Sequence, residues 1–255
     1  MTRLLSGVGL GAGALAAILL LPPFALRLLA CLVAVVAARE YLGVLHHDGR
    51  RPRALPVLLL VVLTCWWMSS PLPGDLLALL LVGLVWLAIE VLFHGLTVDR
   101  AAARFLALWY IGMPLGMLAA VQAIGGRMAT LLLVAAVVVS DSAQYYTGRM
   151  LGRRPLAPAI SPKKTVEGAV GGALFTMVFL ALAGPRVLPP ASAVSLALLG
   201  LAIAALGICG DLFESRLKRI AGVKDSAALI PGHGGILDRI DALLFATPAF
   251  YLYLV

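Results

Sequence analysis

The sequence predicts an all-α, polytopic integral membrane protein with about nine transmembrane helices and a polar cavity that faces the cytoplasm. Of its 255 residues, 62% are hydrophobic and only 13% are charged, whereas charged residues make up about a quarter of a typical soluble domain. A spanning helix needs about 20 mostly apolar residues. Turn signals divide the chain into such stretches at roughly 5–21, 24–45, 55–72, 76–94, 104–123, 128–148, 167–184, 192–212 and 241–255.

The connectors between these stretches fall into two classes, and the difference orients the chain. Short connectors rich in proline and glycine alternate with longer basic ones, at 46–53, 95–104, 149–164 and 215–241. The first residues and the basic connectors hold 16 of the 20 Lys and Arg residues, and the opposite connectors hold two. Because cytoplasmic loops are enriched in Lys and Arg, we expect a multi-pass protein of the inner (plasma) membrane whose site lies on the cytoplasmic side.

Two stretches carry ionisable residues that need separate interpretation. Arg39 and Glu40 end the stretch 24–45, where snorkelling to the interface is the favoured role. Asp141, Gln144, Tyr145 and Gly148 have the spacing i, i+3, i+4 and i+7 within 128–148, so they share one helix face. An ionised group at membrane depth is costly unless it meets water or a partner. This face is therefore expected to line a wet cavity or to form a polar seam between helices.

The next connector contains a candidate anion site in the segment SPKKTVEG, residues 161–168. Lys163 and Lys164 adjoin the start of a predicted helix, which either Ser161 or Thr165 could cap. Ammonium groups, backbone N–H groups and the helix dipole all favour anions. The segment therefore suits a polyphosphate, and an ordinary basic cytoplasmic loop is the competing interpretation.

The stretch 215–241, SRLKRIAGVKDSAALIPGHGGILDRID, concentrates charge between two apolar stretches. Such charge is tolerable where it pairs, faces water or holds an ionic ligand. The segment Pro231–Gly235 cannot be helical, and its glycines expose N–H groups that can receive an anion. His233, within it, could donate to a phosphate or could be satisfied by loop backbone.

Carboxylates flank this charged stretch on both sides. If the helix of 192–212 continues, Asp211, Glu214, Ser215 and Lys218 share one face. Asp238 lies on the other side of the stretch, and folding the stretch over would bring Asp211 and Asp238 together. Mg²⁺ takes oxygen ligands from one or two carboxylates and completes its shell with water and phosphates. We therefore expect a Mg²⁺ site at this pair.

At these residues the sequence resembles the CDP-diacylglycerol synthase (phosphatidate cytidylyltransferase) family. Its C-terminal signature is matched at Ser215, Lys218, Arg219, Lys224, Asp225, Pro231, His233, Gly234, Gly235, Asp238, Arg239 and Asp241. Two upstream features match as well, D-x3-Y-x2-G-R at 141–149 and S-P-K-K-T-x-E-G at 161–168. The resemblance is specific over 141–241 and extends only to hydropathy before that. We therefore divide the chain into N-terminal transmembrane helices, 1–123, and a C-terminal catalytic region, 124–255.

The resemblance implies a Mg²⁺-dependent nucleotidyltransferase that transfers CMP from CTP to phosphatidic acid, giving CDP-diacylglycerol and pyrophosphate. It implies a homodimer in the lipid bilayer, no nucleic-acid partner, Asp211 and Asp238 as metal ligands, and K⁺ as a candidate second cation. The expected catalytic residues are Asp211, Lys218, Arg219, Lys224, Asp225, His233, Asp238, Arg239 and Asp241. The expected substrate-binding residues are Asp141, Tyr145, Ser161, Lys163, Lys164, Thr165, Glu167, Ser215, Gly234 and Gly235.

Other functions would use the same charges on different partners. A lipid or polyprenol kinase is one alternative, and a cytidylyltransferase acting on an isoprenoid lipid is a second. A transporter or scaffold is a third. No inverted repeat is apparent and the charges gather on one face instead of at the membrane midplane, which argues against a transporter.

Overall fold

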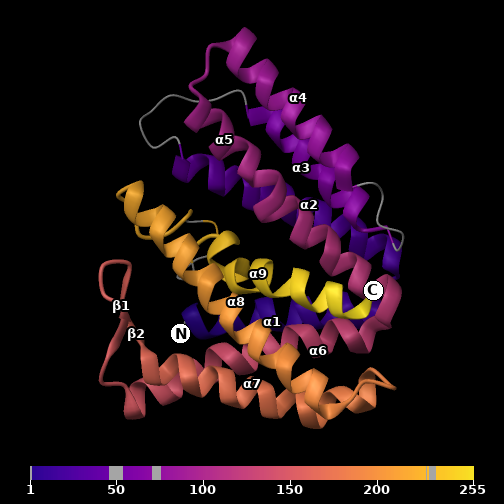
Figure 1. Cartoon of the computed structure of the whole chain (residues 1–255), viewed down its shortest axis with the longest axis vertical. Helices are drawn as coiled ribbons and strands as arrows, with labels where there is room; N and C mark the ends of the chain where they lie inside the picture. Colours follow the sequence, from indigo (N-terminus) through magenta and orange to yellow (C-terminus); the bar gives the residue numbers. More distant parts are fainter. Residues whose placement is uncertain (1, 46–53, 71–75, 228, 230–233) are drawn as a thin grey trace.

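Helices form most of the structure (Figure 1). The computed structural model describes residues 2–45, 54–70, 76–227, 229 and 234–255. The elements are α1 (Thr2–Leu20), α2 (Pro23–Leu45), α3 (Ala54–Met68), α4 (Leu76–His94), α5 (Val98–Ala107), the π-helical η1 (Leu108–Gly112), α6 (Met113–Leu151), β1 (Pro155–Ala157), β2 (Ser161–Thr165), α7 (Val166–Val187), α8 (Ala193–Ile220) and α9 (Leu237–Leu254). A helix pairs its own backbone N–H and C=O groups, for which lipid offers no hydrogen-bond partners.

The helices follow the predicted apolar stretches. In the described part of the chain, four helical runs are long and apolar enough to cross a membrane, namely Pro23–Leu45, Val98–Leu151, Val166–Val187 and Ala193–Ile220. Shorter apolar helices occupy Gly7–Leu20, Ala54–Met68 and Ala78–His94. The chain is therefore an all-α membrane protein with several apolar helices, and its total of nine spans stays a prediction.

The predicted stretches 104–123 and 128–148 belong to one helical run, Val98–Leu151. Helix α5 begins at Val98, inside a segment that was predicted to be a connector, because an amphipathic helix forms there. The run is broken at Gly126, whose φ of 76° and ψ of −178° are not helical and suit glycine because it lacks a Cβ. The chain turns there, beside the C-terminus, and α6 runs back toward the β-hairpin (Figure 1).

Close packing of α6 against α7 sets the frame of the site. A Cβ on Gly172 would overlap the Gln144 side chain and lie 3.1 Å from the Ser140 carbonyl oxygen. A Cβ on Gly168 would lie 2.8 Å from the Gln144 carbonyl oxygen. The two backbones can approach only because these positions lack side chains, and the Asp141 face of α6 is thereby brought beside the start of α7.

Buried apolar side chains form two clusters, and α9 contributes to both. One cluster joins α2, α3 and η1 to the first half of α9, with Tyr41, Ile111 and Leu237 among its members. The other joins α6, α7, α8 and α9, with Leu180 and Phe250 among its members. Helix α9 is therefore held by the N-terminal helices as well as by the C-terminal ones.

A β-hairpin that was not predicted occupies part of the connector 149–164. Strands β1 and β2 are antiparallel, and Pro155 pairs with Thr165. The Thr165 side chain accepts the Gly168 N–H at 3.1 Å and caps α7, whereas Ser161 lies at the start of β2, so of the two candidate caps Ser161 was wrong. The Glu167 carboxylate accepts the backbone N–H groups of the two residues before β1, at 3.0 and 3.2 Å, and ties the hairpin to α7.

Candidate active site

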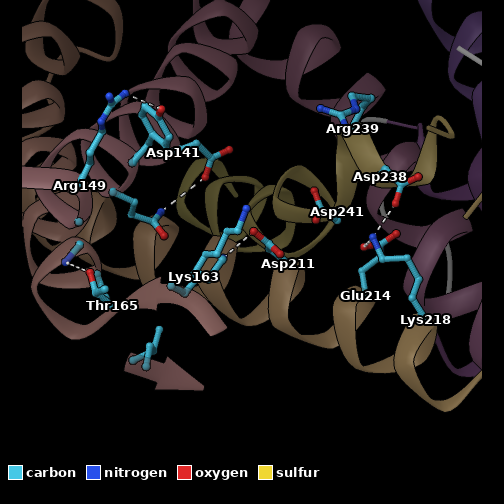
Figure 2. A pocket seen from close by; sticks show the side chains of 17 residues that line it. Asp141, Arg149, Lys163, Thr165, Asp211, Glu214, Lys218, Asp238, Arg239 and Asp241 are labelled. Atoms are coloured by element: carbon cyan, nitrogen blue, oxygen red, sulfur yellow. Dashed lines mark hydrogen bonds and ion pairs between the residues drawn. The ribbon is translucent and has the colours of Figure 1, made fainter. Parts of the chain in front are cut away.

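A cavity of about 700 Å³ lies between α6, the β-hairpin, α7, α8 and α9. Figure 2 shows charged side chains of α6, β2, α8 and α9 around it. It is lined by Asp141, Gln144, Tyr145, Gly148, Arg149, Leu156, Lys163, Lys164, Thr165, Gly168, Ala169, Asp211, Glu214, Lys218, Asp238, Arg239 and Asp241. Segments about 100 residues apart in the sequence thus contribute to one site.

The structure brings together many of the residues that the sequence predicted. Those that line the cavity are Asp141, Tyr145, Lys163, Lys164, Thr165, Asp211, Lys218, Asp238, Arg239 and Asp241. The predicted residues outside this lining are Ser161, Glu167, Ser215, Arg219, Lys224, Asp225, Gly234 and Gly235. His233 lies outside the described residues. The chemical roles assigned to all of these residues stay predictions.

The polar face of α6 contributes to the lining of the cavity. Asp141, Gln144, Tyr145 and Gly148 are all in the lining. The Gln144 side-chain amide donates to the Ser140 hydroxyl at 3.0 Å, and the Arg149 guanidinium donates to the Tyr145 hydroxyl at 3.2 Å. These contacts hold polar groups toward the cavity while the opposite face of α6 packs in the protein core.

Lys164 and Asp211 form the contact between the hairpin and α8. The Lys164 ammonium lies 2.5 Å from Asp211 Oδ2, and the Ser215 hydroxyl donates to Oδ1 at 3.2 Å. Helix α8 continues to Ile220, so Asp211 and Ser215 share a face as predicted. The Asp211 side chain is 35% exposed, which leaves it accessible from the cavity.

Lys218 lies between two buried carboxylates (Figure 2). Its ammonium group is 2.5 Å from Asp238 Oδ1 and also contacts Glu214 Oε2. The Lys218, Glu214 and Asp238 side chains are 13%, 2% and 5% exposed. Within the described residues, Glu214 Oε1 has no hydrogen-bond partner. Glu214 was absent from the predicted site. Its spacing from Asp211, which puts both on one helix face, could have indicated it.

The second oxygen of Asp238 holds the loop before α9. Asp238 Oδ2 accepts the Ser226 N–H at 3.0 Å, the Ser226 hydroxyl at 2.9 Å and the Gly235 N–H at 2.8 Å. Burial alone would raise the pKa of Asp238, but hydrogen bonds with Glu214, then with Lys218 and the backbone N–H groups of Gly235 and Ser226, outweigh it and hold that pKa well below its usual range. The glycine N–H groups of this loop had been expected to receive a bound anion. The Gly235 N–H instead donates to the Asp238 carboxylate.

Glu40, at the end of α2, was expected to reach the membrane interface, and for this residue the expectation was wrong. Its side chain is buried, and its carboxylate accepts N–H groups at the start of α9 and the Ser226 hydroxyl. The partners are 186 to 197 residues away in the sequence. Local sequence shows only a charge at a helix end, so its place beside the site could not be inferred from it.

The donor set of the cavity fits a hard cation. Hard cations take carboxylate oxygens, and Asp141, Asp211, Glu214, Asp238 and Asp241 supply them. Glu214 Oε1 is a buried oxygen for which the described residues provide no donor. No group of three or more His, Cys, Asp or Glu side chains among the described residues could by itself hold a metal. The set therefore suits an ion that completes its shell with water or substrate phosphates.

Comparison with known proteins agrees with this chemistry. The model of the cytidylyltransferase family matches residues 1–255. The chain belongs to this family. Matched motif residues from three parts of the chain thus line one cavity in a cytidylyltransferase-family protein. They are Asp141, Tyr145, Gly148, Arg149, Lys163, Lys164, Thr165, Gly168, Lys218, Asp238, Arg239 and Asp241.

Relatives show similarity over different parts of the chain. The chain is 45% identical to the uncharacterized protein YnbB of Escherichia coli over 130 residues, 51% of this chain and 43% of that protein. It is 40% identical to the phosphatidate cytidylyltransferase of Bacillus subtilis over 160 residues, 62% of this chain and 60% of that protein. It is 33% identical to the phosphatidate cytidylyltransferase of Helicobacter pylori (strain J99) over 196 residues, 77% and 72% of the two chains. The chain thus spans about half the length of the first two relatives, 43% and 60%.

Proposed function

We propose that this protein is a phosphatidate cytidylyltransferase, which transfers CMP from CTP to phosphatidic acid and releases CDP-diacylglycerol and pyrophosphate. One observation carries the proposal: acidic and basic side chains from α6, the β-hairpin, α8 and α9 converge on a single cavity at the positions of the family signature. The name of the relatives from Bacillus subtilis and Helicobacter pylori supports the choice of substrates.

The reaction needs charge neutralisation and alignment. An oxygen of the phosphatidate phosphate forms a bond to the α-phosphorus of CTP, and the bond from that phosphorus to the bridging oxygen of the β-phosphate breaks. Pyrophosphate leaves with the electron pair. Both reactants are anions, so cationic groups that hold them side by side supply most of the catalysis. A phosphate monoester already carries an anionic oxygen near neutral pH, since its second pKa is about 6, and a strong general base is not needed.

We assign the cations of the cavity to the phosphates. Lys163 and Lys164 of β2 both line the cavity, Lys164 contacts Asp211, and we assign both lysines to the triphosphate. Lys218 and Arg239 line the same cavity from α8 and α9. Arg219, Lys224 and His233 complete the proposed phosphate contacts, with Asp225 and Asp241 orienting cations. When substrate enters, Lys164 can exchange its partly exposed Asp211 partner for a phosphate.

Mg²⁺ would be held by Asp211 and Asp238, with K⁺ as a candidate second cation. When bound, the divalent ion would neutralise the charge of the triphosphate. Asp211 is accessible, and Asp238 is held by Lys218 on one oxygen and by loop donors on the other. Asp238 would thus exchange its lysine contact when a metal binds.

The proposal places a homodimer with nine spans in the inner (plasma) membrane and the cavity on the cytoplasmic side, where CTP is made. The charge asymmetry of the connectors supports this orientation. The apolar helices support a multi-pass arrangement.

Incubation of the purified protein with phosphatidic acid, labelled CTP and Mg²⁺ tests the function. Labelled CDP-lipid and pyrophosphate are the expected products. Consumption of ATP with formation of a phosphorylated lipid would instead indicate a kinase. Transfer to an isoprenoid phosphate in preference to phosphatidic acid would indicate the other cytidylyltransferase, and ion flux without turnover would indicate a transporter.

A further inference from the structure

Glu40 makes a contact that joins α2 to the start of α9. Its Oε1 accepts the Ile236 N–H at 2.9 Å, and its Oε2 accepts the Leu237 N–H at 2.8 Å. The first N–H groups of a helix lack intrahelical partners, and a carboxylate there satisfies them and also favours the helix dipole. Ile236, at the cap position of α9, has no polar side chain for this purpose. Glu40 thus supplies from α2 the cap that the local sequence lacks.

The same carboxylate is linked to Asp238 through Ser226. The Ser226 hydroxyl lies 3.1 Å from Glu40 Oε2 and 2.9 Å from Asp238 Oδ2. Because a hydroxyl has one proton, the two carboxylates share a single donor. Asp238 lies in the first turn of α9, so any displacement of that turn displaces Asp238.

Gly235 gives independent evidence for how tightly this contact is built. A Cβ at Gly235 would overlap both Glu40 Oε2 and the Ser226 hydroxyl. The glycine before α9 is therefore needed because a carboxylate from α2 occupies the space of its side chain. The Glu40 side chain is buried, so this carboxylate is committed to the protein instead of to solvent.

We propose that Glu40 is a positioning residue of the active site. It fixes the N-terminal turn of α9 and thereby holds Asp238 and Arg239 on that turn, and Asp241 one turn further on, in the cavity. The expected effect of Glu40 on turnover rests on the proposed function. Its expected effect on the structure of the first turn of α9 does not. The N-terminal helices thus contribute to the geometry of a site whose signature residues all lie after residue 140.

The test combines kinetics with hydrogen–deuterium exchange on the full-length protein. Glu40→Ala is expected to lower kcat by about 10- to 100-fold, as losses of supporting contacts do, and to speed amide exchange at residues 235–237. The KM for CTP should rise by a smaller factor than kcat falls, because Lys163 and Lys164, which are also assigned to the triphosphate, lie on the hairpin. Glu40→Asp keeps both oxygens and should regain part of kcat. Glu40→Gln keeps the size but has one acceptor oxygen, and should stay low.

Glu90→Gln is the matched control. Glu90 is a buried carboxylate of the N-terminal half, 4% exposed, but it pairs with Arg104 at 2.9 Å, away from α9. The Glu90→Gln substitution should lower the melting temperature. It should leave amide exchange at 235–237 and kcat per folded molecule unchanged. Unchanged amide exchange at 235–237 in Glu40→Ala, or a wild-type kcat in that variant, would overturn the proposal. If the alanine variant does not fold, the same two measurements are made on Glu40→Gln, and wild-type values there would overturn it. If the wild type makes no CDP-lipid, the proposed function fails and the exchange rates alone decide on Glu40.

Discussion

Replacing Lys218 by methionine tests the electrostatics of the site most directly. Lys218 separates Glu214 and Asp238, whose side chains are 2% and 5% exposed. Methionine preserves the apolar stem but leaves two buried carboxylates without their shared cation. Removing one partner of a buried ion pair costs about 3–5 kcal/mol, because the remaining charge is uncompensated. At about 2–4 °C per kcal/mol for a chain of this size, the melting temperature in detergent should fall by roughly 6–20 °C.

The double variant Lys218→Met, Glu214→Gln isolates the cause. With one carboxylate neutralised, we expect the variant to regain stability relative to Lys218→Met alone, and a double-mutant cycle gives the coupling energy. Lys224→Met is the matched control, because Lys224 is exposed on the following loop and its loss should leave the melting temperature nearly unchanged. A fall in melting temperature no larger for Lys218→Met than for Lys224→Met would refute the assignment of a buried, stabilising cation.

Three further outcomes are expected. Asp238→Asn should reduce formation of CDP-lipid by orders of magnitude while the protein still inserts, and near-normal turnover would rule out its metal role. Lys163→Ala combined with Lys164→Ala should mainly raise the KM for CTP, so an unchanged CTP dependence would count against the polyphosphate site. Gly172→Ala should destabilise the α6–α7 contact by about 1–3 kcal/mol through overpacking. Gly43→Ala, where no described atom lies within 4 Å of the added Cβ, should not be destabilising in a thermal melt.

Hydropathy predicted the helices well because lipid leaves the backbone few alternatives. The break at Gly126 fell in a glycine pair that the sequence had marked as a connector. The hairpin was missed because its strands are short and their sequences, PLA and SPKKT, lack the alternation of apolar and polar residues that marks a strand. Glu167 holds the chain before β1 against α7.

The candidate site was predictable where periodicity or motif spacing carries the information. The face of Asp141 and Tyr145 followed from the helical repeat, and the convergence of Asp211 and Asp238 on one cavity followed from the charged stretch between them. The sequence could not predict which lysine pairs with which carboxylate, because these pairs depend on distances that only the fold sets. The sequence could not show that Lys164 meets Asp211 or that Lys218 meets Asp238.

The division of the chain at residue 123 describes where the signature residues lie, but the site depends on contacts across that boundary. Leu237 and Leu244 of α9 are buried with residues of α2 and α3, and Glu40 of α2 satisfies the first N–H groups of α9. Without the N-terminal helices, α9 would expose these apolar side chains, and the N–H groups at its start would lose the Glu40 carboxylate that accepts them. Asp238 lies on the turn that would lose these contacts first. The N-terminal half is therefore needed for the geometry of the cavity as well as for embedding the protein in the membrane.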